Sequence, residues 1–159
     1  MLTQVVGRAG RGESEGSAMI QTMSPQHKVI TLAAQQDYDG FYELESNLRR
    51  TLCYPPFADL VQITFTGQEE TAVLRGAVKF RDSLQACLKL PDYGEADCTV
   101  LGPAPCAVMK INYHFRYRLT MRCHLTPQLR ALIAHILRQF AMDKANRGVS
   151  AFADINGYD

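Results

Sequence analysis

Two kinds of hydrophobic spacing succeed each other from residue 59 onward. Val61, Ile63 and Phe65 alternate with polar residues, which predicts a half-buried strand. After Gly67 and the acidic pair Glu69-Glu70, apolar residues recur at the three- and four-residue spacing of one helical face: Val73, Ala77, Phe80, Leu84 and Leu88. Acidic residues favour a helix start because they meet the positive end of the helix dipole. The pattern therefore predicts a strand followed by a helix over residues 69–88.

The remainder of the chain continues this order. Residues 99–112 and 115–123 predict two strands joined through Tyr113 and His114, and 149–155 predict a last strand. Thr126-Pro127 begins a helix whose inward face holds Leu129, Leu132, Ile133, Ile136, Leu137 and Phe140. The βαββαβ order predicts an α+β, ferredoxin-like split βαβ domain, with two helices on one face of a four-stranded antiparallel sheet. The other face is left open, and such a face is solvated or binds a partner.

Two helices are expected ahead of this domain, within residues 25–57. Ser24 suits an N-cap and Pro25 a first turn, for a helix that runs to about residue 36. A second helix over 38–52 places Phe41, Leu44, Leu48 and Leu52 on one face, and Tyr54-Pro55-Pro56 ends it. A short apolar strand is expected at residues 18–21.

Composition restricts the class of protein. The chain has 159 residues, of which 47% are hydrophobic and 21% charged, which argues against disorder. The net charge of +1 gives no global nucleic-acid signature, so any DNA affinity must come from local clustering. An apolar run of 18 residues and a signal-peptide pattern are both missing from the sequence, which predicts a cytoplasmic protein without a membrane partner. Five cysteines without a CxxC pair, and four histidines without ligand spacing, indicate reduced thiols and no metal site.

Residues 4–12, Gln-Val-Val-Gly-Arg-Ala-Gly-Arg-Gly, look like the last motif of superfamily 2 helicases. In that motif Arg8 and Arg11 would reach toward the γ-phosphate of ATP, with Gln4 as the polar lead residue. The sequence contains neither a GxxxxGK[ST] phosphate loop nor an acidic box for Mg²⁺. We therefore expect no ATPase activity from this chain alone, in which the two arginines act as ordinary exposed side chains.

Further motifs follow this one in a fixed order: Gln36-Asp37-Tyr38, Phe41-Tyr42, Arg49-Arg50, Tyr54-Pro55-Pro56-Phe57, Leu101-Gly102-Pro103-Ala104-Pro105 and Phe115-Arg116-Tyr117-Arg118. The series resembles the C-terminal end of the bacterial primosomal helicases, the PriA (primosomal protein N′) family. The family usually ends in Asp-x-Asp-Pro, whereas this chain has Asp154-Ile155-Asn156-Gly157, which leaves the contacts of the last strand open.

The resemblance implies three parts: 1–24, a remnant of the second RecA-like helicase lobe; 25–57, linking helices; and 58–159, the C-terminal domain. It implies a fragment of an ATP-dependent 3′→5′ DNA helicase that acts in replication restart and primosome assembly. In the parent protein, ATP, Mg²⁺ and Zn²⁺ would be bound elsewhere; the fragment itself is expected to need no cofactor. The domain would bind forked or single-stranded DNA and pack on the helicase core.

Residues 116–123 carry the candidate DNA contacts. Alternation puts Arg116, Arg118 and Arg122 on one strand face, and Tyr117, Leu119, Met121 and Cys123 on the other. Together with Lys110, Tyr113 and His114, the arginines would form a basic patch with aromatic neighbours, suited to phosphates and unstacked bases. A solvated strand face that blocks edge pairing is the alternative. Helix cations could extend the patch, although such charges are more often a solvated helix face: Arg49, Arg50, Arg75, Lys79 and Arg81.

Two other classes of function remain open. The first is a protein-interaction module, because the resemblance implies binding to the acidic, hydrophobic tail of single-stranded DNA-binding protein. Arg130 is then the candidate contact. The second is a free-standing small-molecule-binding regulator, which would leave the helicase motif unexplained.

Overall fold

The structure is a computed structural model that describes residue 4 and residues 17–157. The chain divides into two compact units, residues 1–51 and residues 52–159. Gln4 is exposed, whereas Arg8 and Arg11 lie outside the described residues.

The first unit contains α2, Lys28–Ala34, and α3, Tyr38–Thr51. The prediction that Ser24 caps a helix beginning at Pro25 is wrong, because the Ser24 carbonyl instead accepts the His27 N–H at 3.1 Å and closes a turn. His27 takes the N-cap position, where its Nδ1 accepts the Val29 N–H at 3.3 Å. The strand expected at residues 18–21 is also absent: these residues have no regular structure, and a lone strand has no partner for its ladder.

The apolar face predicted for the second helix is present in α3 but is only partly covered by the described residues, because Phe41 and Leu44 are half-buried. Neither α2 nor α3 has a buried side chain, and Leu48 keeps 51% of its surface exposed. A groove of about 470 Å³ separates the two helices, lined by Lys28, Thr31, Leu32, Gly40, Glu43, Leu44 and Asn47.

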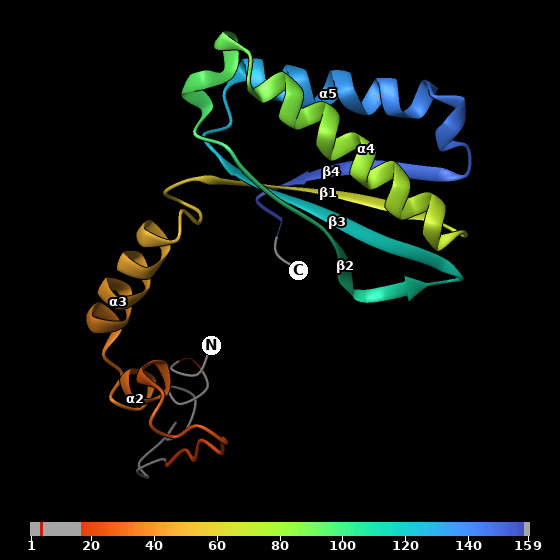
Figure 1. Cartoon of the computed structure of the whole chain (residues 1–159). Coiled ribbons are helices and arrows are strands. Elements are labelled where there is room, and N and C mark those ends of the chain that lie inside the picture. Colours follow the sequence, from red (N-terminus) through yellow and green to blue (C-terminus); the bar gives the residue numbers. More distant parts are fainter. Residues whose placement is uncertain (1–3, 5–16, 158–159) are drawn as a thin grey trace. The chain divides into compact units, whose positions relative to one another are not determined.

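The second unit has the predicted βαββαβ order. Its elements are β1 (Asp59–Gly67), α4 (Glu70–Leu88), β2 (Thr99–Ile111), β3 (His114–Cys123), α5 (Pro127–Met142) and β4 (Val149–Ile155). Two 3₁₀ turns, η1 (Pro91–Ala96) and η2 (Lys144–Asn146), follow the helices. The sheet is antiparallel throughout in the order β2-β3-β1-β4, and α4 and α5 lie on one of its faces (Figure 1). The ferredoxin-like fold class is therefore confirmed.

Three aromatic rings form the centre of the core between the sheet and the two helices. Phe65 contacts Phe80 and Phe140 edge to face, with ring centroids 5.3 and 5.5 Å apart. Gly76 permits this packing, since a Cβ there would lie 3.1 Å from the Phe140 ring. The alternating residues of the two central strands complete the core, with Ile63 opposite Leu119 and both fully buried.

Asn156 makes the contacts of the last strand that the sequence left open. Its backbone N–H donates to the Leu60 carbonyl at 2.7 Å, and its side-chain oxygen accepts the Leu60 N–H at 2.8 Å. Its Nδ2 donates to the Asp59 carboxylate at 3.0 Å, and the Leu125 N–H donates to the same carboxylate at 2.9 Å. These two hydrogen bonds are the main reason that the pKa of Asp59 lies below its ordinary value.

Candidate nucleic-acid interface

The predicted alternation along β3 is confirmed by burial. Tyr117, Leu119, Met121 and Cys123 are buried under the helices. Arg116, Arg118 and Arg122 lie on the opposite face, where each side chain is partly exposed. The three arginines nevertheless have different surroundings, which decide what each can bind.

Arg122 is engaged within its own unit. Its Nη1 donates to the Leu52 carbonyl at 2.9 Å, and its guanidinium lies 5.8 Å from the centre of the Tyr54 ring. These contacts hold the segment that precedes β1 against the end of β3. Arg122 therefore has mainly a structural role, because a DNA phosphate would have to compete with the Leu52 carbonyl for its guanidinium.

Arg118 lies in the shielded middle of the open face. It is opposite Thr64 on β1, and Thr64 in turn is opposite Phe152 on β4. Thr64 keeps only 4% of its surface exposed although neither helix covers this face, and the Nε atom of Arg118 is buried. Arg118 is thus less accessible than a guanidinium extended into solvent.

Lys110 lies on the face opposite to the arginines. Pro105 of β2 is opposite Tyr117 of β3, and Lys110 is opposite Phe115. Between these two pairs, residues 106–109 of β2 form a bulge that faces a single residue of β3, Arg116. Directly opposed residues share a sheet face, so Lys110 shares the helix-side face of Phe115. Its Nζ lies 4.3 Å from the centre of the Phe115 ring. The structure therefore does not bring Lys110 onto the arginine face, as a patch on one face would require.

The connection between β2 and β3 is Asn112-Tyr113, one residue earlier than the predicted Tyr113-His114. Both residues have positive φ, 48° and 64°, as in the type I′ turn that suits the twist of a hairpin. The His114 Nδ1 donates to the Asn112 carbonyl at 2.8 Å and braces the turn. Tyr113 keeps 82% of its surface exposed.

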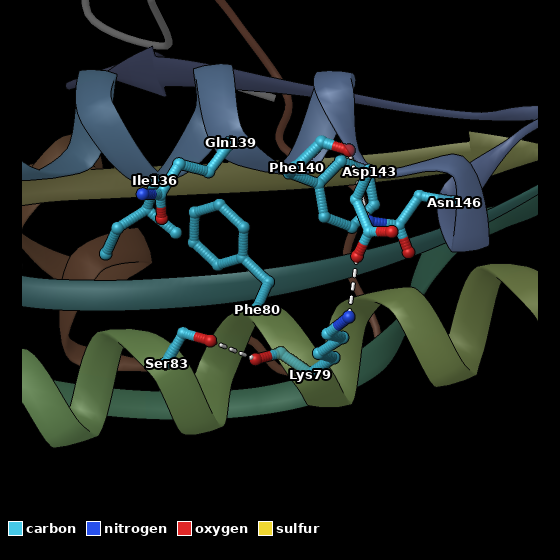
Figure 2. A pocket seen from close by; sticks show the side chains of 8 residues that line it. All are labelled: Lys79, Phe80, Ser83, Ile136, Gln139, Phe140, Asp143 and Asn146. Atoms are coloured by element: carbon cyan, nitrogen blue, oxygen red, sulfur yellow. Dashed lines mark hydrogen bonds and ion pairs between the residues drawn. The ribbon is translucent and has the colours of Figure 1, made fainter.

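The cations of α4 have contacts inside the domain. Lys79 forms an ion pair with Asp143 at 2.6 Å beside a cavity of about 80 Å³ between α4 and α5 (Figure 2). This hydrogen bond, followed by that from the Ala145 N–H, lowers the pKa of Asp143. Arg81 pairs with Asp82 at 2.7 Å, and Arg75 donates to the Ala145 carbonyl at 3.5 Å. The contacts favour the interpretation of these residues as ordinary helix charges.

Charge is distributed unevenly along the chain, a signal that the net charge of +1 conceals. Residues 98–142 contain six lysines and arginines and no aspartate or glutamate. This stretch includes β2, β3 and α5. The acid-free stretch gives the hairpin a positive net charge. Counting aspartates and glutamates in a sliding window along the sequence would have located this stretch without the structure.

Arg130, the candidate for partner binding, is exposed in the first turns of α5. It lies close enough to Asp59 to contribute, as one of the smaller effects, to the lowered pKa of that carboxyl. Arg49 pairs with Glu45 at 2.7 Å within α3.

The five cysteines are all free thiols; Cys106 and Cys123 are buried, and Cys53 is exposed. The pKa of Cys123 is raised by its hydrogen bond with Cys98 and by burial, which makes it a poor nucleophile. Within residues 17–157, no cluster of three His, Cys, Asp or Glu side chains could hold a metal ion. The described helices are too short or too polar to span a membrane.

Comparisons with known proteins agree on one family. A family model described as the primosomal protein N C-terminal domain matches residues 50–157. The chain is 34% identical over 158 residues to "Replication restart protein PriA" of Bacillus subtilis, covering 99% of this chain and 19% of that protein. The protein of the same name from Treponema pallidum is 30% identical over 98% of this chain and 22% of its own length. That of Synechocystis is 35% identical over 76% of this chain and 14% of its own length. The chain thus spans about a fifth or less of these relatives.

Proposed function

Because the chain belongs to the primosomal protein N C-terminal domain family, we propose that it serves as the non-catalytic C-terminal part of a replication-restart helicase. Its contribution is to bind DNA through the end of the β2–β3 hairpin. ATP hydrolysis, 3′→5′ unwinding and the binding of ATP, Mg²⁺ and Zn²⁺ belong to other parts of the parent protein. Arg8, Arg11 and Gln4 serve nucleotide sensing only in that larger context.

One observation carries the DNA-binding proposal: the hairpin end exposes two cations and an aromatic ring within an acid-free stretch of chain. Lys110 is exposed and Arg116 is partly exposed, and the exposed Tyr113 lies between them in the sequence. Cations bind phosphates through charge, and aromatic rings stack on bases without requiring a particular sequence. Arg118 and Arg122 contribute less, since the first is shielded and the second holds the Leu52 carbonyl.

The proposal is tested by fluorescence anisotropy of the chain with labelled forked DNA over a series of salt concentrations. Two phosphate contacts, one each from Lys110 and Arg116, predict a log–log slope of about −2. Lys110→Gln or Arg116→Gln should each reduce the magnitude of this slope by about 1. Arg138→Gln is the matched control, because Arg138 is an exposed cation on α5 outside the hairpin.

Equal loss of affinity from Arg138→Gln and from the hairpin variants would mean that only net charge matters. If the parent chain binds no DNA even at low salt, the DNA-binding proposal fails. The interaction module would then take its place, to be tested with a peptide of the single-stranded DNA-binding protein tail and the Arg130→Glu variant.

The open sheet face supports the second part of the role, packing on the helicase core. Leu101 on β2 and Phe152 on β4 keep 45% and 50% of their surfaces exposed on this face. The two side chains lie on the outer strands of the sheet, so a domain packed across this face would cover both of them. The double variant Leu101→Ser, Phe152→Ser should weaken the association of this chain with a separately produced helicase core, measured by analytical ultracentrifugation. The unfolding temperature of the chain itself should stay unchanged.

A further inference from the structure

The two cations of the hairpin end, exposed Lys110 and partly exposed Arg116, lie on opposite faces of the ribbon. Lys110 shares the helix side with Phe115, whereas Arg116 lies on the open side. A duplex lying along the sheet would meet only one of them. A DNA that contacts both must pass on either side of the hairpin end.

Tyr113 occupies the point between these cations in an unfavourable backbone conformation. Its φ of 64° is in the left-handed region, where side chains other than glycine and asparagine are disfavoured. The favoured partner of asparagine in a type I′ turn is glycine. The cost of the tyrosine is not offset by burial, because 82% of its surface is exposed. Such a residue points to a function for its ring.

We propose that Tyr113 stacks on the last base pair at a DNA branch point, where two strands separate around the hairpin end. Lys110 then contacts the phosphates of one departing strand and Arg116 those of the other. Residues 98–142 contain no aspartate or glutamate that would repel either strand, and the carboxylate of Glu70 on α4, which lies near this end of β3, accepts a hydrogen bond from the Tyr117 hydroxyl at 2.7 Å. This inference rests on the proposed DNA binding and names the DNA structure that the site recognises.

The geometry favours a branch point over an intact duplex for a further reason. A ring can stack on a base pair only where that pair lacks a neighbour on one side, as at a fork or an open end. The turn is braced by the 2.8 Å hydrogen bond between His114 and the Asn112 carbonyl, so the ring is presented from a fixed backbone. A preorganised contact loses less entropy on binding than one on a mobile loop.

The experiment compares a forked DNA with a duplex closed by a loop at each end, which has no open base pair. Each carries 2-aminopurine, either in the pair at the fork or in the middle of the closed duplex. Tyr113→Gly is the decisive variant, because Asn-Gly stabilises the turn while removing the ring. Tyr113→Phe keeps the ring and is the matched control.

We expect the parent chain and Tyr113→Phe to change the fluorescence of 2-aminopurine at the fork but not in the closed duplex. Stacking on one base predicts that Tyr113→Gly loses about tenfold in affinity for the fork and less than twofold for the closed duplex. Unchanged fork affinity of Tyr113→Gly, or equal losses on both DNAs, would overturn the inference while DNA binding persists. A parent chain that binds neither DNA refutes the DNA-binding proposal itself, and this inference with it.

Discussion

Gly67, the last residue of β1, provides a sharp test of the packing beside the end of the β2–β3 hairpin. It is opposite Phe115 of β3 on one side and Val149 of β4 on the other. A Cβ at residue 67 would lie 2.6 Å from the Gly148 carbonyl oxygen and 3.0 Å from Val73 Cγ2. Ordinary contact begins near 3.4 Å, so Gly67→Ala must displace the start of β4 by about 0.8 Å or distort the pairing.

The expected loss of stability follows from two opposing effects. Overpacking against a backbone carbonyl costs about 1–3 kcal/mol, because the carbonyl cannot rotate away as a side chain would. Replacing glycine by alanine restricts the unfolded chain and returns about 0.4–1 kcal/mol. We therefore expect Gly67→Ala to lower the free energy of unfolding by roughly 1–2 kcal/mol, measured by urea titration with far-UV circular dichroism at constant m-value.

Gly148→Ala separates steric overlap from backbone strain. A Cβ at residue 148 meets no atom within 4 Å, but the φ of 85° is in the left-handed region. Gly148→Ala should therefore cost about 1 kcal/mol, and Gly148→Asn should recover much of it, since asparagine tolerates that region. Substitutions at residue 67 should show no such recovery. A Gly67→Ala variant as stable as the parent would refute the close approach of β4 to β1.

Two further predictions concern single charged groups. The pKa of Asp59 is lowered in the folded chain, so its hydrogen bonds stabilise the fold above the ordinary pKa of about 4 and are lost as the pH falls through the folded value. Asp59→Asn should reduce the fall of the urea unfolding midpoint between pH 5 and pH 3. If the midpoint of this variant falls as steeply as that of the parent, other carboxyl groups cause the loss of stability. Arg122→Gln should cost about 1 kcal/mol of stability through the lost Leu52 and Tyr54 contacts. The same variant should change DNA affinity less than twofold at fixed salt. A fivefold loss would instead mean that Arg122 contacts DNA directly.

The fold of the second unit follows from periodicity because one sheet face and one face of each helix are buried together. Val61, Ile63 and Phe65 are fully buried, as their alternation predicts, and Leu119 and Met121 meet them from β3. A register slip by one residue would expose the whole set, so this pattern specifies the pairing strongly. The first unit was less predictable, because its helices bury no side chain and local turn chemistry set their bounds.

The candidate site was only partly predictable, since alternation assumes an unbroken strand. It correctly separated Arg118 from Leu119. It did not locate the bulge in β2, because Pro103 and Pro105 signal irregularity without giving its length. The contact between Arg122 and the Leu52 carbonyl joins residues 70 positions apart, and no local pattern reports it.

The bulge of residues 106–109 also determines how the hairpin end can vary among related chains. Because these four residues oppose only Arg116, their number is not fixed by the core, and loop-like segments tolerate changes in length. Removing one residue there would leave Lys110 opposite Phe115, because the two-residue turn sets this pair independently of the bulge. Small insertions and deletions at this point would thus be absorbed by the bulge, so chains that differ in length here can keep the two cations on opposite faces of the hairpin end.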